Sequence, residues 1–225
     1  MSFVGRPTQS PGVGSKYKNV TAKMTIEEYK DSVINLDGED QRKIFTQKSY
    51  FHGLPFVFNE REDDYYFFRK RIADNFQVEF YEVMIVGSSK FGFSPYKFTK
   101  FSLDSDIDVV IFNETLFEKY FDLVSEYQYK IKNQEIRLNT EQYKKYLKFI
   151  KYFIRGWMRP DLLPQNTQAF KEIKKDWDDF FKSISHSKSE VGNYIVKAGL
   201  FKNQKYAEKY YRSSIEEILK KLKSL

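Results

Sequence analysis

Apolar residues in the first half of the chain recur at spacings that predict helices and strands in alternation. Two capping boxes, Thr25 with Glu28 and Asn59 with Glu62, mark predicted helix starts. The first helix is expected to end near residue 36, followed by an Asp37-Gly38 turn. The second presents one apolar face at helical spacing: Tyr65, Phe68, Ile72 and Phe76.

Two short runs rich in β-branched residues predict buried strands. The run YEVMIV (81–86) ends at Gly87, and the run IDVVIF (107–112) follows a loop of about twenty residues. Asn113 is then positioned to cap another helix. The apolar face of that helix comprises Leu116, Phe117, Tyr120, Phe121 and Val124. Two strands therefore alternate with helices in this half.

The second half is predicted to be mostly helical. In residues 141–155 the pattern turns Leu147, Ile150 and Ile154 inward and lysines outward. Those lysines are Lys144, Lys145, Lys148 and Lys151. Later amphipathic stretches cover residues 167–181, with Phe170, Ile173, Trp177 and Phe181, and residues from about 205, with Tyr211, Ile215, Ile218 and Leu222. Residues 129–138 and 194–196 are possible further strands.

Composition narrows the class of protein. With 225 residues, 41% of them hydrophobic and 18% aromatic, the chain has material for a sizeable core. It contains no cysteine and two histidines, so any metal ion must be held mainly by carboxylates. No stretch approaches the roughly 18 apolar residues of a membrane span, and residues 1–23 lack the apolar run of a signal peptide. A cytoplasmic protein without membrane contact is expected.

The charge is unevenly distributed. The formal net charge is +7, and residues 1–23 contain four basic residues, no acidic residue and several Gly, Pro and Ser. That composition predicts a flexible basic arm, because it offers little apolar surface to bury. A basic protein suits a polyanionic partner such as nucleotides or nucleic acid, but an ordinary solvated basic surface explains the charge equally well.

The first candidate functional motif is Gly87-Ser88-Ser89-Lys90, directly after the first predicted strand. A helix that begins there would present free backbone N–H groups at its N-terminus. These groups favour the binding of phosphate. Glycine allows the backbone to approach a ligand, and the serine hydroxyls and the lysine add donors. The alternative is an ordinary strand-to-helix turn.

The second candidate motif is Asp106 and Asp108 at the start of the second strand. Side chains alternate along a strand, so both carboxylates point to one face, while Ile107 and Val109 point to the other. Two neighbouring carboxylates repel unless a cation lies between them, and Mg²⁺ prefers such oxygen ligands. The alternative is an acidic turn, formed by Asp104 and Ser105 with Asp106.

Taken together, Val86-Gly87-Ser88 followed by Asp106-Ile107-Asp108-Val109 resembles the nucleotidyltransferase superfamily of DNA polymerase beta, over residues 59–127. The resemblance implies an α+β fold with a polymerase-beta-like core, a small mixed sheet flanked by helices. It implies that the Gly-Ser turn holds the triphosphate of an NTP or dNTP and that the aspartates bind two Mg²⁺ ions. The implied reaction transfers a nucleoside monophosphate to an acceptor hydroxyl.

Two features depart from that family. Eighteen positions separate Ser88 from Asp106, longer than usual, so residues 91–103 are interpreted as an insertion that flanks the site. A third carboxylate from a later strand is also expected, and no segment shows its pattern clearly. Asp161 is favoured slightly over Glu135 for this catalytic role. Their structural alternatives are a turn or cap for Asp161 and a solvated edge charge for Glu135.

The predicted organisation is an arm (1–23), a nucleotidyltransferase core (24–135) and a mainly helical region packed on it (136–225). The resemblance extends to small bacterial enzymes of antiviral defence that make oligonucleotide or nucleotide messengers, and to toxin–antitoxin transferases that modify tRNA or protein. For either kind of enzyme, the resemblance implies a partner encoded in the same operon, an effector or an antitoxin. The alternative hypothesis is a non-catalytic nucleic-acid-binding module that retains the fold.

Overall fold

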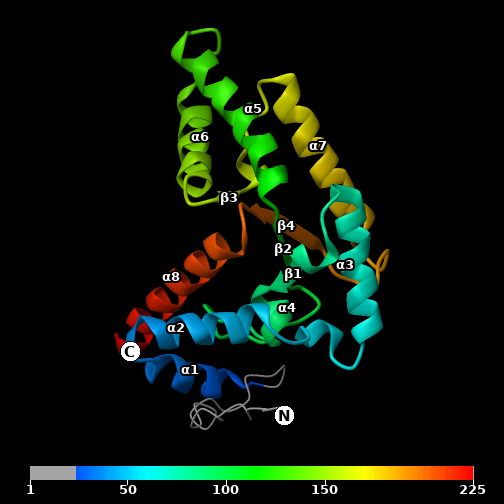
Figure 1. Cartoon of the computed structure of the whole chain (residues 1–225), viewed down its shortest axis with the longest axis vertical. Helices are drawn as coiled ribbons and strands as arrows, with labels where there is room; N and C mark the ends of the chain where they lie inside the picture. Colours follow the sequence, from blue (N-terminus) through cyan, green and yellow to red (C-terminus); the bar gives the residue numbers. More distant parts are fainter. Residues whose placement is uncertain (1–23, 225) are drawn as a thin grey trace, which may run out of the picture.

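The strand predicted over residues 107–112 lies inside a four-stranded mixed sheet (Figure 1). The computed structural model describes residues 24–224 and shows an α+β fold within them. The sheet order is β1-β2-β4-β3, in which β2 is antiparallel to β1 and parallel to β4, and β3 is antiparallel to β4. The strands are β1 (Val83–Val86), β2 (Ile107–Phe112), β3 (Trp157–Met158) and β4 (Val196–Phe201).

Eight α-helices surround this sheet within the described residues. They are α1 (Ile26–Ile34), α2 (Gly38–Thr46), α3 (Glu62–Phe76), α4 (Gly87–Phe91), α5 (Glu114–Lys132), α6 (Thr140–Phe153), α7 (Gln168–Ser183) and α8 (Gln204–Lys223). None of them is long and apolar enough to cross a membrane. The arm predicted at residues 1–23 lies outside the described residues.

Alternation along β2 divides the core into two clusters. Ile107, Val109 and Ile111 face one cluster, which contains apolar residues of α3, α5, α6 and α7. Val110 and Phe112 face the other, which contains residues of α1, α2 and α8. The same alternation places Asp108 on the second face, toward α8. The sheet therefore separates the helices on either side of it, as Figure 1 shows.

The helix starts test the capping predictions. Thr25 forms a full capping box with Glu28, and the Asn113 side chain accepts a hydrogen bond from the backbone N–H of Leu116. The box predicted at Asn59 is wrong: Asn59 ends a 3₁₀ turn, and α3 begins after Arg61 without a side-chain cap. The predicted Asp37-Gly38 turn lies where the chain enters α2: Asp37 is the N-cap, and Gly38 has a φ of +72°, which glycine adopts readily.

Three predictions about the second half need correction. Residues 129–138 form no strand, because α5 continues to Lys132. Of residues 194–196 only Val196 is in a strand, and β4 runs on to Phe201. On α6 the buried residues are Tyr146, Phe149 and Phe153, whereas Leu147 and Ile154 are exposed. The predicted boundary near residue 135 falls between α5 and α6, and the sheet takes strands from both sides of it.

Candidate active site

Gly87 brings the two predicted motifs into contact. Val86, the last residue of β1, lies opposite Asp108 in the β1–β2 ladder, and α4 begins at the next residue. Gly87 has a φ of +66°, and a Cβ added there would lie 2.5 Å from Asp108 Oδ2. Both observations favour glycine at this position, because a side chain would meet Asp108 and strain the backbone. The glycine-serine turn and the aspartate strand therefore form one site.

The Asp106 and Asp108 carboxylates lie close together. Both line the same cavity, and the negative charge of Asp106 acts on Asp108. The Asp108 side chain is accessible from the cavity, but protein surrounds it on most sides and solvates it poorly. This desolvation, with the Asp106 charge second, raises the pKa of Asp108 from 3.8 to about 6. A cation bound at this site would therefore reduce the repulsion between the two carboxylates.

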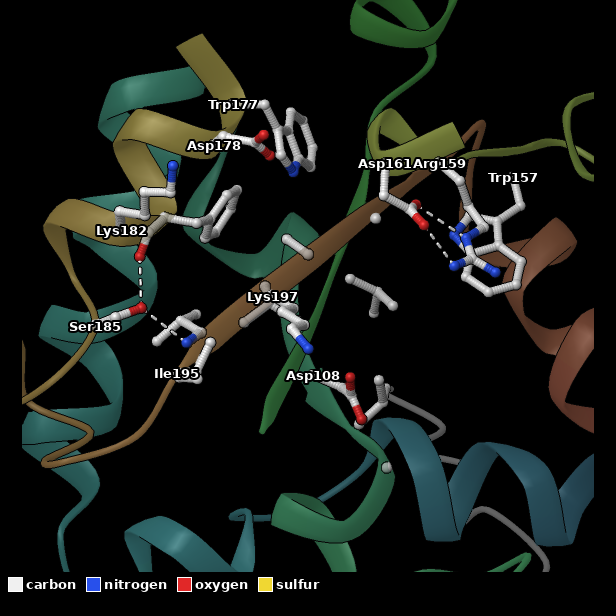
Figure 2. Close-up of a pocket in the computed structure, with 18 of the residues that line it drawn as sticks. Asp108, Trp157, Arg159, Asp161, Trp177, Asp178, Lys182, Ser185, Ile195 and Lys197 are labelled. Carbon is white, nitrogen blue, oxygen red and sulfur yellow. Dashed lines mark hydrogen bonds and ion pairs between the residues drawn. The ribbon is translucent and has the colours of Figure 1, made fainter. Parts of the chain in front are cut away.

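Lys197 supplies a cation at this site, and the sequence analysis missed it. It lies beside Asp108 in the parallel β2–β4 ladder, and its Nζ is 2.6 Å from Asp106 Oδ2. Figure 2 shows its amino group pointing toward Asp108, and its charge opposes the rise in the Asp108 pKa. The signal for this residue was a polar position in an otherwise apolar strand, VKAGLF. It was missed because β4 was predicted to end at its first residue.

Two residues of the predicted phosphate-binding motif point away from the site. Ser89 is buried, and its hydroxyl donates to the Val86 carbonyl at 3.0 Å. Lys90 is also buried, and its Nζ donates to the carbonyls of His52 and Gly53, both at 2.6 Å. Neither side chain therefore faces a ligand at the turn. Of the motif, Gly87 and Ser88 line a cavity.

Burial changes the pKa of Lys90, and the change can be tested. Desolvation lowers its pKa from 10.5 to about 8, so between about pH 8 and 10.5 the unfolded chain binds more protons than the folded chain. Across that window we expect the free energy of unfolding of the wild type to rise relative to that of Lys90→Met. Denaturant unfolding of both proteins at several pH values measures this difference. Parallel pH profiles would contradict the buried placement.

Two cavities meet at Gly87 and Asp108. The smaller, about 550 Å³, is lined on one side by the predicted insertion. Its polar lining includes Ser88, Ser94, Lys97, Thr99 and Lys100, together with the acidic residues Asp104, Asp106 and Glu217. The larger, about 840 Å³, extends past β4 to α7 (Figure 2). Its lining includes Trp157, Arg159, Asp161, Trp177, Lys182 and Lys197. Asp108 therefore lies where two molecules of different character could meet.

The predicted insertion is anchored beside the site. Phe93 is buried and forms an isolated β-bridge with Lys100, and Phe101 stacks on Tyr194 with ring centroids 5.1 Å apart. From α8, the Lys221 ammonium lies over the ring of Phe98. These contacts hold the loop that carries Lys97 and Lys100. Neither lysine has an ion-pair partner within residues 24–224.

The two candidates for a third carboxylate lie in different places. Asp161 lines the larger cavity, but both of its oxygens accept hydrogen bonds from Arg159, at 3.1 and 2.8 Å (Figure 2). Glu135 is exposed in the turn after α5 and lines neither cavity. Across residues 24–224 no three acidic or histidine side chains gather as a metal site. The acidic centre is therefore the pair Asp106 and Asp108.

Comparisons with known proteins do not assign this chain to a family. No family model, curated protein or solved structure matches this chain.

Proposed function

We propose that this protein is a Mg²⁺-dependent nucleotidyltransferase with a polymerase-beta-like core, which transfers a nucleoside monophosphate from an NTP or dNTP to an acceptor hydroxyl. The observation that carries the proposal is the contact between Gly87 and Asp108. A pair of neighbouring carboxylates lies against a turn whose backbone conformation favours glycine. This contact supports the proposal because it places the glycine-serine turn beside the two carboxylates.

The carboxylates fit the metal that this chemistry uses. Mg²⁺ is commonly held by one or two carboxylates together with substrate phosphates and water, rather than by a complete protein cage. Asp106 and Asp108 would hold it, and their mutual repulsion and poor solvation favour its arrival. When bound, such ions lower the pKa of an attacking hydroxyl and neutralise the leaving pyrophosphate. Because no third acidic or histidine side chain in the described part of the chain joins this pair as a metal site, we expect metal affinity to depend strongly on bound nucleotide.

The smaller cavity suits the triphosphate. Gly87 leaves the backbone open, Ser88 provides a hydroxyl, and Lys97 and Lys100 bring positive charge that no ion pair among residues 24–224 neutralises. We therefore assign to these two lysines the phosphate contact that sequence analysis gave to Lys90. The larger cavity reaches Asp108 from the other side and has room for an acceptor.

Incubating the protein with Mg²⁺ and each labelled NTP and dNTP, followed by mass analysis of the products, tests the proposal. Candidate acceptors are water-soluble nucleotides, tRNA and the protein itself. We expect a product that contains a transferred nucleoside monophosphate, with pyrophosphate released and no product in EDTA. A protein that binds nucleotides but forms no product with any acceptor would contradict the transferase.

Lys197 favours a second candidate function, a binding module that retains the fold without catalysis. Its ammonium already neutralises Asp106 at 2.6 Å, and the strand next to β2 carries no acidic residue. In such a module the lysine would permanently replace a metal ion. The two functions differ in whether a divalent cation can displace the lysine.

Lys197→Met distinguishes these functions. If Lys197 competes with the metal, removing its charge should strengthen Mn²⁺ binding at least tenfold in the absence of nucleotide, measured by calorimetry. Lys202→Met, just beyond the end of β4, is the matched control and should leave the affinity unchanged. If neither the wild type nor Lys197→Met binds Mn²⁺, with or without NTP, the binding module becomes the better account.

A further inference from the structure

The outer face of α6 carries a line of apolar side chains, three of them exposed and one, Ile150, partly buried against the core. Tyr143, Leu147, Ile150 and Ile154, here called the α6 seam, are separated by four, three and four positions. At 3.6 residues per turn they lie within about 60° of the helix circumference. Tyr143 is 49% exposed, Leu147 41% and Ile154 77%. Such spacing is the a/d pattern through which one helix packs on another.

A different face of α6 makes the contacts with the rest of the protein. Tyr146 packs edge-on against Tyr127 of α5, and Phe153 stacks on Phe117 with ring centroids 4.8 Å apart. Phe149 is fully buried next to both. In Figure 1 α5 and α6 run side by side away from the sheet, with α6 at the edge of the molecule. The seam is therefore available, and core packing does not explain its three exposed apolar side chains, Tyr143, Leu147 and Ile154.

A strip of positive charge runs along the side of the seam that faces away from α5. Lys144, Lys148, Lys151 and Arg155 occupy it, and all four are exposed. None of them forms an ion pair with another residue of the described chain, 24–224. In helix pairs, charges beside the apolar seam select the partner. This basic strip therefore favours a partner that carries acidic residues.

We propose that the α6 seam docks an amphipathic helix of a partner protein, with apolar residues at heptad spacing and acidic residues beside them. The length of the seam, about 16 Å, matches three turns of such a helix. The proposal does not depend on the transferase activity, because the seam lies on α6 and lines neither cavity at Asp108.

Other occupants fit the seam less well. A second copy would bring the same basic strip against this one, and like charges repel. Nucleic acid would meet the lysines but gain little from the aliphatic side chains. A helix that lies in a membrane surface has a broad apolar face, whereas this seam is the narrow type that helices use with one another. An acidic helix satisfies both the apolar line and the charge.

The test uses a synthetic three-heptad peptide, with leucine at the a and d positions and glutamate beside them, and measures binding by fluorescence anisotropy. The control peptide has the same composition in scrambled order. We expect the wild type to bind the heptad peptide at least tenfold more tightly than the scrambled peptide. Leu147→Ser with Ile154→Ser, and separately Lys144→Glu with Lys151→Glu, should each weaken binding at least tenfold.

Lys145→Glu is the matched control, because Lys145 lies on the opposite side of α6 from the seam. It should change the affinity less than threefold, and circular dichroism confirms that each variant is folded. Equal binding of both peptides, or no effect of the seam variants, would overturn the proposal. So would vesicles of anionic lipid binding through the seam in place of the peptide, or a wild-type dimer that the seam variants dissociate.

Discussion

Asp106→Asn and Asp108→Asn should each reduce product formation at least a thousandfold, about 4 kcal/mol of barrier, while the protein stays folded. Asparagine keeps the volume of the side chain but removes one of the two paired carboxylates, which no third acidic or histidine side chain of residues 24–224 joins as a metal site. Initial rates at saturating NTP and Mg²⁺ measure the effect. Either variant turning over at near the wild-type rate would show that the pair does not hold the metal.

Stability measurements distinguish a chemical loss from a structural one. Because folding raises the pKa of Asp108 from 3.8 to about 6, ionising this carboxyl destabilises the folded state. That cost is absent below about pH 3.8, grows up to about pH 6 and is complete above it. In EDTA, Asp108→Asn should therefore melt at or above the wild-type temperature at pH 7, and the gain should disappear as the pH falls toward 4. A lower melting temperature at pH 7 would contradict the placement of Asp108.

Gly87→Ala should weaken NTP binding at least tenfold and reduce product formation at least a hundredfold, about 2.7 kcal/mol of barrier. The new Cβ would lie 2.5 Å from Asp108 Oδ2, so the carboxylate must move away from the position where it meets the metal and the phosphates. The backbone at φ +66° resists the change as well. Calorimetry with a non-hydrolysable NTP and Mg²⁺, together with rate measurements, checks both effects.

Gly38→Ala is the matched control for backbone strain. Gly38 has a similar φ, +72°, and no described atom lies within 4 Å of a Cβ added there. This variant should lose about 1 kcal/mol of stability from the left-handed backbone and retain activity. If Gly87→Ala behaves like Gly38→Ala, the turn is structural and Gly87 has no role at the site.

The sequence predicted those parts of the site that depend on short-range pattern. Alternation along residues 106–109 placed Asp106 and Asp108 on one face, and Gly87 marked a turn that L-residues with side chains rarely adopt. Lys90 shows the limit. Its type and position suit phosphate, but whether a side chain in a five-residue helix points outward depends on packing, here against the segment at His52 and Gly53.

Pairings between segments far apart in the chain could not be predicted from the sequence pattern. Lys197 meets Asp106 because β4 joins β2 across ninety-one positions, and one polar residue in a strand does not indicate its neighbour. On α6, apolar residues occupy two faces, so the period of 3.6 fits either face as the core. The aromatic residues Tyr146, Phe149 and Phe153 take the core, which left Leu147 and Ile154 on the surface.

The central claim is that Gly87, Asp106 and Asp108 form a single site for a metal and a nucleoside triphosphate. Calorimetric titration of a non-hydrolysable NTP, with and without Mg²⁺, into wild type and Asp106→Asn/Asp108→Asn tests it most directly. We expect binding to the wild type to be at least tenfold tighter with Mg²⁺ than in EDTA, and the double variant to lose this difference. Binding that is equally tight in EDTA, or a Mg²⁺ effect that persists in the double variant, would contradict the claim.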